Sequence, residues 1–226
     1  MHLDYHIPVP FLRPTPEEFA WAEEHIIPSC ELAAKKLFEK YGPKFDKANV
    51  KQDIFNGWGT AERIKEHFSE LELKIRRFCV FVGAPGATYP TPHIDANHYD
   101  HMKLTGIPMI ARLNIPLQGT ANSKLSWWNA DITDTRIKER KFEEWNEQQG
   151  KMVFAFSYRT DTNSEWGEPS HVEYEPGPCW NHVELAHRLD IEDIPEIRIN
   201  ITAEISNPIP WKTLVERLQT KGYCHS

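Results

Sequence analysis

Residues 196–205 read EIRINITAEI, where isoleucine at alternate positions is interleaved with arginine, asparagine and threonine. Successive side chains of a β-strand point to opposite faces of a sheet, so the pattern predicts a late strand with one apolar and one polar face. A guanidinium on the polar face is stabilised when a carboxylate meets it in a bidentate pair. Arg198 therefore either binds an anionic partner inside the fold, or faces solvent, or forms a structural ion pair.

The sequence upstream of this segment has the pattern of further short strands. FCVFV (residues 78–82) is a continuous apolar run followed by Gly83, Pro85 and Gly86, which is typical of a buried strand. Additional strands are expected at residues 109–117, 123–129, 151–158, 171–174 and 179–185. Such a series favours a sandwich or a closed barrel. The charged stretch IKERKFEEWNEQQ (137–149) is predicted to be a short surface helix or a lid-like insertion instead.

Both ends of the chain have helical patterns. TPEE (15–18) is a capping-box sequence that should begin a helix, Pro28 should break it, and Gly42-Pro43 should end the second piece. Another helix is expected from about Thr60 to Arg76, and a last one near residues 210–221. We therefore expect a single domain (1–226) with mainly helical N-terminal support (1–77), a β-core (78–206) and a C-terminal helix (207–226).

The composition is that of a globular protein and argues against two classes of partner. The mean hydropathy is −0.58 and no apolar run approaches a transmembrane span, so a membrane protein is not expected. Lys and Arg number 26 against 33 Asp and Glu, which makes a nucleic-acid partner unlikely on electrostatic grounds. No secretion signal is recognised at the N-terminus, and the four scattered cysteines have no CxxC pair. The expected location is the cytoplasm, with free thiols.

The first residues with metal-binding chemistry lie in YPTPHID (89–95). Two prolines keep this segment extended, so His93 and Asp95 should emerge on the same side, where an imidazole and a carboxylate can share one metal ion. Eleven histidines make such pairs common by chance, and similar pairs occur at residues 98–100, 171–173 and 182–184. Any one pair taken alone also has a purely structural interpretation.

A second polar group lies in PGPCWNHVELAH (176–187), whose last histidine precedes Arg198 by eleven residues. An HxD pair, then a distant histidine, then Arg-x-Asn after a run of short strands resembles the iron(II)- and 2-oxoglutarate-dependent dioxygenases, nearest their aspartyl/asparaginyl hydroxylase and phage-type oxygenase branches. The resemblance spans roughly residues 78–206 and rests on order and spacing, because no motif is long. It implies a mainly β fold with flanking helices and a double-stranded β-helix core of the jelly-roll or cupin-like type.

The same resemblance implies a metal site. His93, Asp95 and His187 would be the ligands of Fe(II), with His182 as the competing distal ligand; His187 is preferred because its distance in sequence from Arg198 is near that usual in the family. Two imidazoles and one carboxylate on one face of an octahedral ion form a facial triad, which leaves three positions open.

The resemblance also implies a cosubstrate site. Arg198 would bind the distal carboxylate of 2-oxoglutarate, and Asn200 stands where the family often has serine or threonine. Asn114, in the strand ARLNIPL (111–117), could touch the cosubstrate, although an exposed strand face is an equally good interpretation.

Three residues are candidates for substrate binding: Arg112 for an anionic group, Trp128 at the border of a pocket, and His98 on a loop after the HxD pair. The expected activity is oxidative decarboxylation of 2-oxoglutarate coupled to hydroxylation of an unidentified amino acid, peptidyl side chain or small metabolite, with molecular oxygen as the second cosubstrate. Two alternatives remain open at this point: a cupin-type metalloenzyme that does not use 2-oxoglutarate, and a non-catalytic β-sandwich binding module.

Overall fold

The protein is mainly β, with two antiparallel sheets and a few helices. The computed structural model describes residues 3–87, 91–98, 111–120, 123–146, 151–160, 165–174, 176–191, 196–207 and 209–225. The helices are α1 (Pro16–His25), α2 (Ile27–Tyr41), α3 (Gly59–Glu70) and α5 (Trp211–Thr220), with two short 3-10 helices, η1 (Pro10–Leu12) and η2 (Gln52–Phe55). The strands are β1 (His6–Pro8), β2 (Phe45–Ala48), β3 (Ile75–Gly83), β4 (His93–His98), β5 (Ala111–Gln118), β6 (Ser123–Trp127), β7 (Ile137–Asn146), β8 (Lys151–Thr160), β9 (His171–Tyr174), β10 (Cys179–His182), β11 (His187–Ile191) and β12 (Arg198–Ile205).

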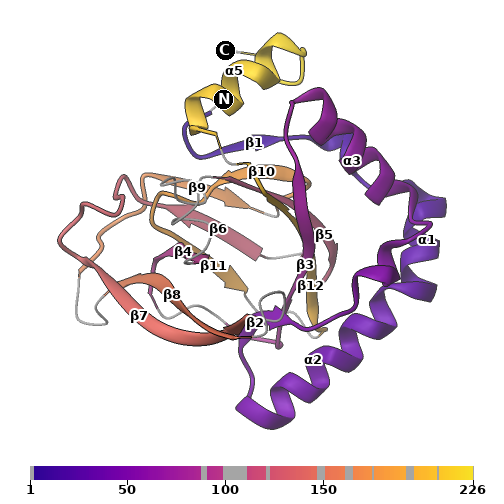
Figure 1. Cartoon of the computed structure of the whole chain (residues 1–226), viewed down its shortest axis with the longest axis horizontal. Coiled ribbons are helices and arrows are strands. Elements are labelled where there is room, and N and C mark those ends of the chain that lie inside the picture. Colours follow the sequence, from indigo (N-terminus) through magenta and orange to yellow (C-terminus); the bar gives the residue numbers. More distant parts are fainter. Residues whose placement is uncertain are drawn as a thin grey trace.

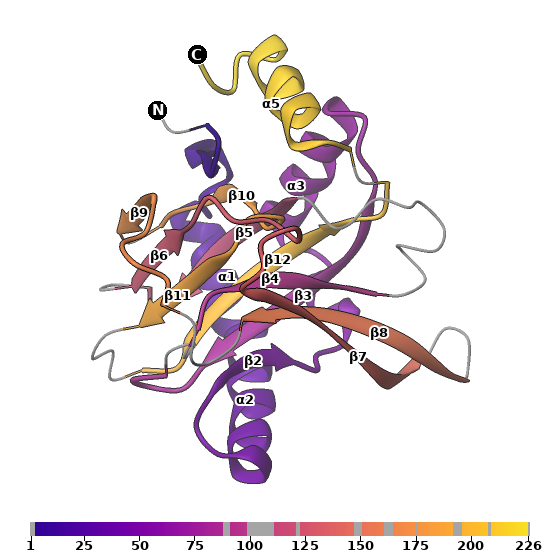
Figure 2. The same cartoon turned by 90° about the vertical axis from the view of Figure 1, so that its left-hand side faces the viewer.

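Each sheet contains six of these strands. Sheet A has the order β1-β10-β5-β12-β3-β2, and sheet B has the order β7-β8-β4-β11-β6-β9. In Figure 1 the helices α1, α2 and α3 lie on one side of the molecule beside β3, β5 and β12, and the strands of sheet B lie on the other side. Figure 2 shows β7 and β8 as a long pair at the edge of sheet B. The described helices α1, α2 and α3 thus cover one face of sheet A.

The first two helices, α1 and α2, begin and end where the sequence predicts. The Thr15 hydroxyl accepts a hydrogen bond from the Glu18 backbone N–H, and the Glu18 carboxylate accepts one from the Thr15 N–H, which completes the capping box. A new helix begins at Ile27 with Pro28 in its first turn, where the missing N–H costs nothing. Glu18 also accepts a hydrogen bond from the Thr60 hydroxyl (3.0 Å) and pairs with Arg63, so that the same carboxylate joins α1 to α3.

The main hydrophobic core lies between these helices and sheet A. Alternate residues of β12 point into it, and Ile199, Ile201 and Ala203 are fully buried there. Leu113 and Ile115 of β5 and the apolar stripe of α3 complete the contact. The other face of β12 is polar and also buried, because it faces sheet B. The alternation in EIRINITAEI therefore separates two buried environments rather than core and solvent.

Three of the predicted elements are corrected by the structure. IKERKFEEWN is strand β7 and not a helix or lid: it pairs with β8 over ten residues at the edge of sheet B, where a charged strand can remain solvated on one side. The helix predicted to reach Arg76 ends at Glu70, and β3 begins at Ile75 after a turn that includes Glu72 at φ 53°. The strand predicted at 179–185 is β10 and ends at His182. His187 was expected just past the end of that strand, but it is the first residue of the next one, β11.

Two further predictions can be compared with the structure. All four cysteines are buried and free, as the absence of CxxC pairs indicated. In the described part of the chain, no helix has the length and apolar character needed to cross a membrane.

Candidate metal and cosubstrate site

A His-x-Asp pair and a distant histidine meet at the centre of sheet B. His93 and Asp95 are residues one and three of β4, so both side chains point to the same face. His187 is the first residue of β11 and is the cross-strand partner of His93. Directly opposed residues of an antiparallel pair share a face of the sheet, and the two imidazole centroids are 4.7 Å apart. His93 and His187, which are 94 positions apart in the sequence, thus lie side by side.

The donor atoms of these three side chains converge. The Nε2 atoms of His93 and His187 each lie 3.7 Å from Oδ1 of Asp95. Adjacent ligands that are about 2.1 Å from an octahedral ion are about 3.0 Å apart, so shifts of well under 1 Å would bring each imidazole nitrogen to that separation from Asp95 Oδ1. Two imidazoles and one carboxylate on one side of an ion are the donor set of the facial triad, and the residues present therefore fit a divalent transition metal.

The orientation of His187 is fixed from behind. Its Nδ1 donates a hydrogen bond to the Leu185 carbonyl oxygen at 2.8 Å, which places the remaining lone pair on Nε2, the atom that faces Asp95. Metal-binding histidines commonly donate their second N–H to a carbonyl or carboxylate in this way, because that contact sets the tautomer and the plane of the ring.

Asp95 is held from the opposite side by a guanidinium. Oδ2 of Asp95 is 3.1 Å from Nε of Arg112, while Oδ1 faces the two imidazoles. Burial alone would raise the pKa of Asp95, but Arg112, His187 and His93 together hold this pKa below its usual range. The carboxylate is therefore in its charged, metal-binding form at neutral pH.

Arg112 also belongs to a larger charge cluster on sheet A. Glu204 of β12 is buried, with its carboxylate 2.8 Å from Arg77, 3.8 Å from Lys47 and 3.9 Å from Arg112. Burial would raise the pKa of Glu204, but the three cations lower it strongly. Glu204 thus offsets the positive charge that would otherwise surround Arg112. Sequence analysis gave Glu204 no role, although the alternation in β12 places it on the polar face.

The triad opens onto a cavity between the two sheets. The cavity is narrow: the space that the centre of a water molecule can reach in it is about 80 Å³. Its polar lining includes the three triad residues and a row from sheet A: Arg112, Asn114, Arg198, Asn200 and Thr202. Its apolar lining includes Phe81, Leu125, Val183 and Leu189. Arg198, Asn200 and Asn114 are therefore brought to the same cavity as the triad.

The polar row is internally hydrogen-bonded. Asn114 Oδ1 accepts hydrogen bonds from the Thr202 hydroxyl at 2.7 Å and from the Asn200 amide at 3.2 Å. The Asn200 amide is also 3.0 Å from the Thr202 hydroxyl. In the described part of the chain, the buried Oδ1 of Asn200 has no hydrogen-bond partner. Thr202 joins this group as a residue that sequence analysis placed on the polar face without assigning it a role.

A glycine sets how close β12 lies to its neighbour at Arg198. Gly119 follows β5 at φ 62°, in the left-handed region that favours glycine. A Cβ at this position would lie 2.8 Å from the Cα of Arg198, closer than side chains are found. The Gly119 N–H also donates a hydrogen bond to the Glu196 carboxylate at 3.2 Å. The start of β12, and with it the buried Arg198, is therefore positioned by backbone contact.

Three other candidates lie differently. His182 donates a hydrogen bond to the Asp4 carbonyl oxygen and stacks on Trp211 at 4.6 Å, so it is His187 that lies beside His93. Trp128 is not among the described residues lining the cavity; it packs in an edge-to-face contact with Trp166 and donates a hydrogen bond to Gly167. The backbone of His98 ends β4, but its side chain lies outside the described residues.

Comparison with known proteins adds little. No family model matches the chain, and no curated protein matches it. Two solved structures that match are the non-heme alpha ketoglutarate dependent carbocyclase SnoK and epimerase SnoN, both from nogalamycin biosynthesis. SnoK is 11% identical, with 84% of each chain covered and a TM-score of 0.32. SnoN is 12% identical, with 88% of this chain and 76% of its own covered, again at 0.32. Similarity at this level carries no argument about function.

Proposed function

We propose that this protein is a non-haem iron(II)- and 2-oxoglutarate-dependent oxygenase. The observation that carries the proposal is the convergence of two imidazoles and one carboxylate at the wall of a cavity that also contains a buried guanidinium. The His-x-Asp pair and the buried arginine could each have a purely structural role when taken alone, because both features are common in proteins. Their meeting in one cavity is what the facial-triad chemistry requires.

The strand arrangement supports a double-stranded β-helix for the core. From β3 to β6 the chain alternates between sheet A and sheet B, and from β9 to β12 it alternates again, starting from sheet B. Each sheet thereby receives four of these eight strands, and β1, β2, β7 and β8 extend the edges. We assign the core to the jelly-roll class on this basis.

In this proposal His93, Asp95 and His187 hold Fe(II). The bound metal would supply redox chemistry and open coordination positions, which the side chains of the chain cannot provide. The chain contributes position: Leu185 orients His187, and Arg112 holds Asp95 so that one oxygen faces the ion. We therefore assign Arg112 to the metal site first, with any contact to substrate as a secondary role.

Arg198 is the proposed partner of the distal carboxylate of 2-oxoglutarate. Its side chain is buried in the wall of the cavity, and a planar guanidinium matches the geometry of a carboxylate in a bidentate pair. The hydrogen-bonded group of Asn114, Asn200 and Thr202 lies beside it and would offer neutral donors and acceptors to the same ligand. Phe81, Leu125 and Leu189 would limit the entry of water.

The substrate class proposed is a small molecule or a peptidyl side chain, with molecular oxygen as the second cosubstrate. The mixed polar and apolar lining of the cavity suits a small ligand or one side chain of a larger one. A role in substrate contact for Trp128 or His98 remains a prediction from the sequence. Trp128 does not line the cavity, and the side chain of His98 lies outside the described residues.

The proposal is tested by calorimetric titration of the Mn(II)-loaded protein with 2-oxoglutarate in the absence of oxygen. We expect 2-oxoglutarate to bind to the wild type and Arg198→Lys to weaken that binding at least tenfold without changing Mn(II) affinity, because lysine cannot form the bidentate pair. Arg188→Lys is the matched control: Arg188 neighbours His187 in β11, but it pairs with Asp190 and does not line the cavity.

Removal of the metal site is the second arm of this experiment. Asp95→Ala should weaken Mn(II) binding at least 100-fold and abolish Fe(II)-dependent succinate release, because it removes the only anionic donor of the triad. A protein that binds Mn(II) through Asp95 but does not bind 2-oxoglutarate would overturn the proposal in favour of a cupin-type enzyme. A protein with no Asp95-dependent metal binding would favour the non-catalytic module.

A further inference from the structure

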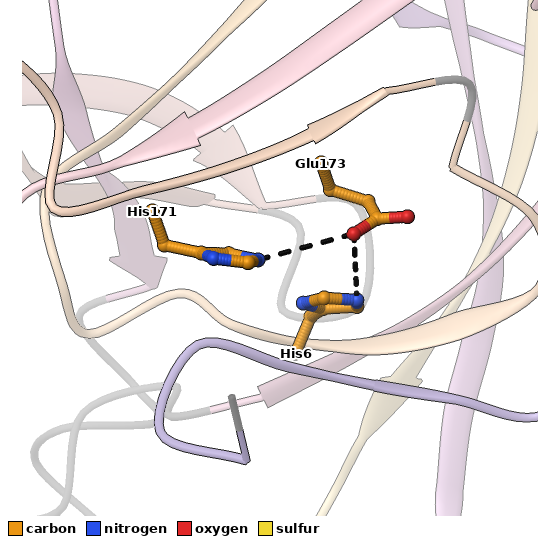
Figure 3. A group of neighbouring side chains, drawn as sticks. All are labelled: His6, His171 and Glu173. Atoms are coloured by element: carbon orange, nitrogen blue, oxygen red, sulfur yellow. Dashed lines mark ion pairs between the residues drawn. The ribbon is translucent and has the colours of Figure 1, made fainter. Parts of the chain in front are cut away.

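A second group of two histidines and one carboxylate lies at the edges of the two sheets. His6 is in β1, one of the two edge strands of sheet A, and His171 and Glu173 are in β9, one of the two edge strands of sheet B. His171 and Glu173 are two residues apart on an extended strand, so both point to the same face. Figure 3 shows both imidazoles directed at the same oxygen of Glu173.

The separations in this group suit a small tetrahedral ion. Nε2 of His6 lies 3.2 Å from Oε2 of Glu173, and Nε2 of His171 lies 3.9 Å from the same oxygen. One donor atom from each residue lies within 4.8 Å of the others. Ligands that are about 2.0–2.1 Å from a tetrahedral ion are about 3.3 Å apart, so small side-chain rotations would bring all three into bonding range.

Aromatic contacts fix the planes of both imidazoles. His6 stacks on Trp127 with ring centroids 5.6 Å apart, and His171 stacks on Tyr5 at 5.2 Å. The two imidazoles also stack on each other at 5.1 Å. The His6 ring is almost completely buried, whereas the Glu173 side chain is 35% exposed. Two ligands are therefore preorganised in an apolar wall, and the third lies on the side from which an ion and water can enter.

We propose that His6, His171 and Glu173 form a second metal site, which binds one Zn(II) and joins β1 to β9. Two neutral imidazoles and a carboxylate are a common zinc donor set, with water in the fourth position. Zn(II) is favoured over Fe(II) at such nitrogen-rich sites by the general order of divalent affinities. The ion would link the edges of two sheets that are joined by no strand pairing among the described residues at this point.

This site is separate from the triad and does not rest on the proposed oxygenase activity. Trp127 of β6 is the cross-strand partner of both His171 and His187, so it stands between the two clusters. Each cluster can consequently be removed without touching a ligand of the other.

The experiment uses chelator-treated, metal-free protein in two separate titrations. One is with Zn(II), and the other is with Co(II) as a spectroscopic probe. Asp95→Ala is used as the background, because it disables the triad and leaves the second cluster intact. We expect one remaining equivalent of Zn(II), with the intense visible absorption of four-coordinate Co(II) at the same stoichiometry. Zinc should also raise the unfolding temperature of this variant, because it binds only the folded state.

Glu173→Gln in the same background should lower Zn(II) affinity at least 100-fold and abolish the increase in unfolding temperature. Glu184→Gln is the matched control: Glu184 also faces a histidine, His182, at 3.5 Å, but no third metal-binding side chain joins that pair among the residues that the structure describes. Zinc binding should therefore not change in this variant. His6→Gln provides an independent loss should Glu173→Gln fold poorly.

Failure to bind any Zn(II) in the Asp95→Ala background would overturn the second site. Binding that survives both Glu173→Gln and His6→Gln would do so as well. Neither result bears on 2-oxoglutarate binding at the triad, which is measured separately.

Discussion

The two faces of sheet A carry different kinds of buried side chain, and strand β12 contributes to both. The face against α1, α2 and α3 is apolar, with Ile199 and Ile201 of β12 fully buried in the main core. The face toward sheet B carries Arg198, Asn200 and Glu204, which are almost as deeply buried. One strand therefore supplies both the apolar core and the polar wall of the cavity, from alternate residues.

In β12, therefore, residues that pack in the main core alternate with residues to which we assign the proposed binding of 2-oxoglutarate. Substitutions on the helix side should alter the free energy of unfolding and leave ligand affinity unchanged. Substitutions on the cavity side should do the reverse, unless the residue belongs to the charge cluster. The following predictions test where this separation holds and where it fails.

The largest effect is expected from Glu204→Gln, where the separation should fail. The substitution leaves Arg77, Lys47 and Arg112 without their shared buried anion, and we expect the free energy of unfolding to fall by about 4 kcal/mol. Urea unfolding of the metal-free protein measures this. Glu62→Gln, which removes an exposed pair with Lys65, should cost under about 1 kcal/mol. Equal effects for the two variants would mean that the cluster contributes no net stability.

Ile201→Ala tests the helix side and should have the next largest effect. Ile201 is fully buried and pairs with Val80 and Ile115, so the truncation should leave a cavity and cost about 3 kcal/mol. Ile201→Val should cost only about 1 kcal/mol. The affinity of the Mn(II)-loaded protein for 2-oxoglutarate should change less than about twofold in either variant. A large loss of affinity would show that the two faces are coupled.

The smallest effect concerns His67 of α3, a titratable group on the apolar side. His67 is buried and accepts a hydrogen bond from Trp180 Nε1 at 3.1 Å; burial lowers its pKa to about 4, against a smaller opposing effect of Glu70. Between pH 6.5 and about 4 the unfolded chain binds a proton that the folded protein does not, so stability should decrease as the pH falls through this range. The expected loss from pH 7 to pH 4.5 is about 2 kcal/mol.

His67→Gln is the control for this pH dependence, because glutamine can accept the same hydrogen bond but does not titrate. Unfolding free energies of the two proteins are compared at pH 7 and pH 4.5. The variant should lose about 2 kcal/mol less than the wild type over this range. An identical pH dependence would show that His67 titrates normally or is protonated in the folded state.

Much of the secondary structure was predictable because its signals are local. The alternation in β12, the apolar run in β3 and the capping box of α1 are each fixed by neighbouring residues. The charged strand β7 was mispredicted because its pairing with β8 at the sheet edge, not its own composition, determines its conformation. No local pattern distinguishes a charged edge strand from an amphipathic surface helix over ten residues.

The candidate triad was predictable only through order and spacing. His93 and Asp95 share a face by strand periodicity, but the position of His187 beside them depends on the pairing of β11 with β4. The group of His6, His171 and Glu173 could not be predicted from the sequence for the same reason. His171-x-Glu173 is visible in the sequence as one of several such pairs, and His6 lies at the opposite end of the chain, on a different sheet. Glu204 gave no signal because its cations come from three other strands.

Gly119 has a consequence for how the cavity can vary. The position of Arg198 in the cavity wall depends on a residue that has no side chain, because a Cβ at Gly119 would lie 2.8 Å from the Cα of Arg198. A methyl group there would displace the beginning of β12 sideways, and the reach of the arginine would change although every polar residue of the wall was retained. Under the proposed function, affinity for the cosubstrate would therefore be altered from the backbone outside the cavity, by a substitution that a comparison of cavity-lining residues would overlook.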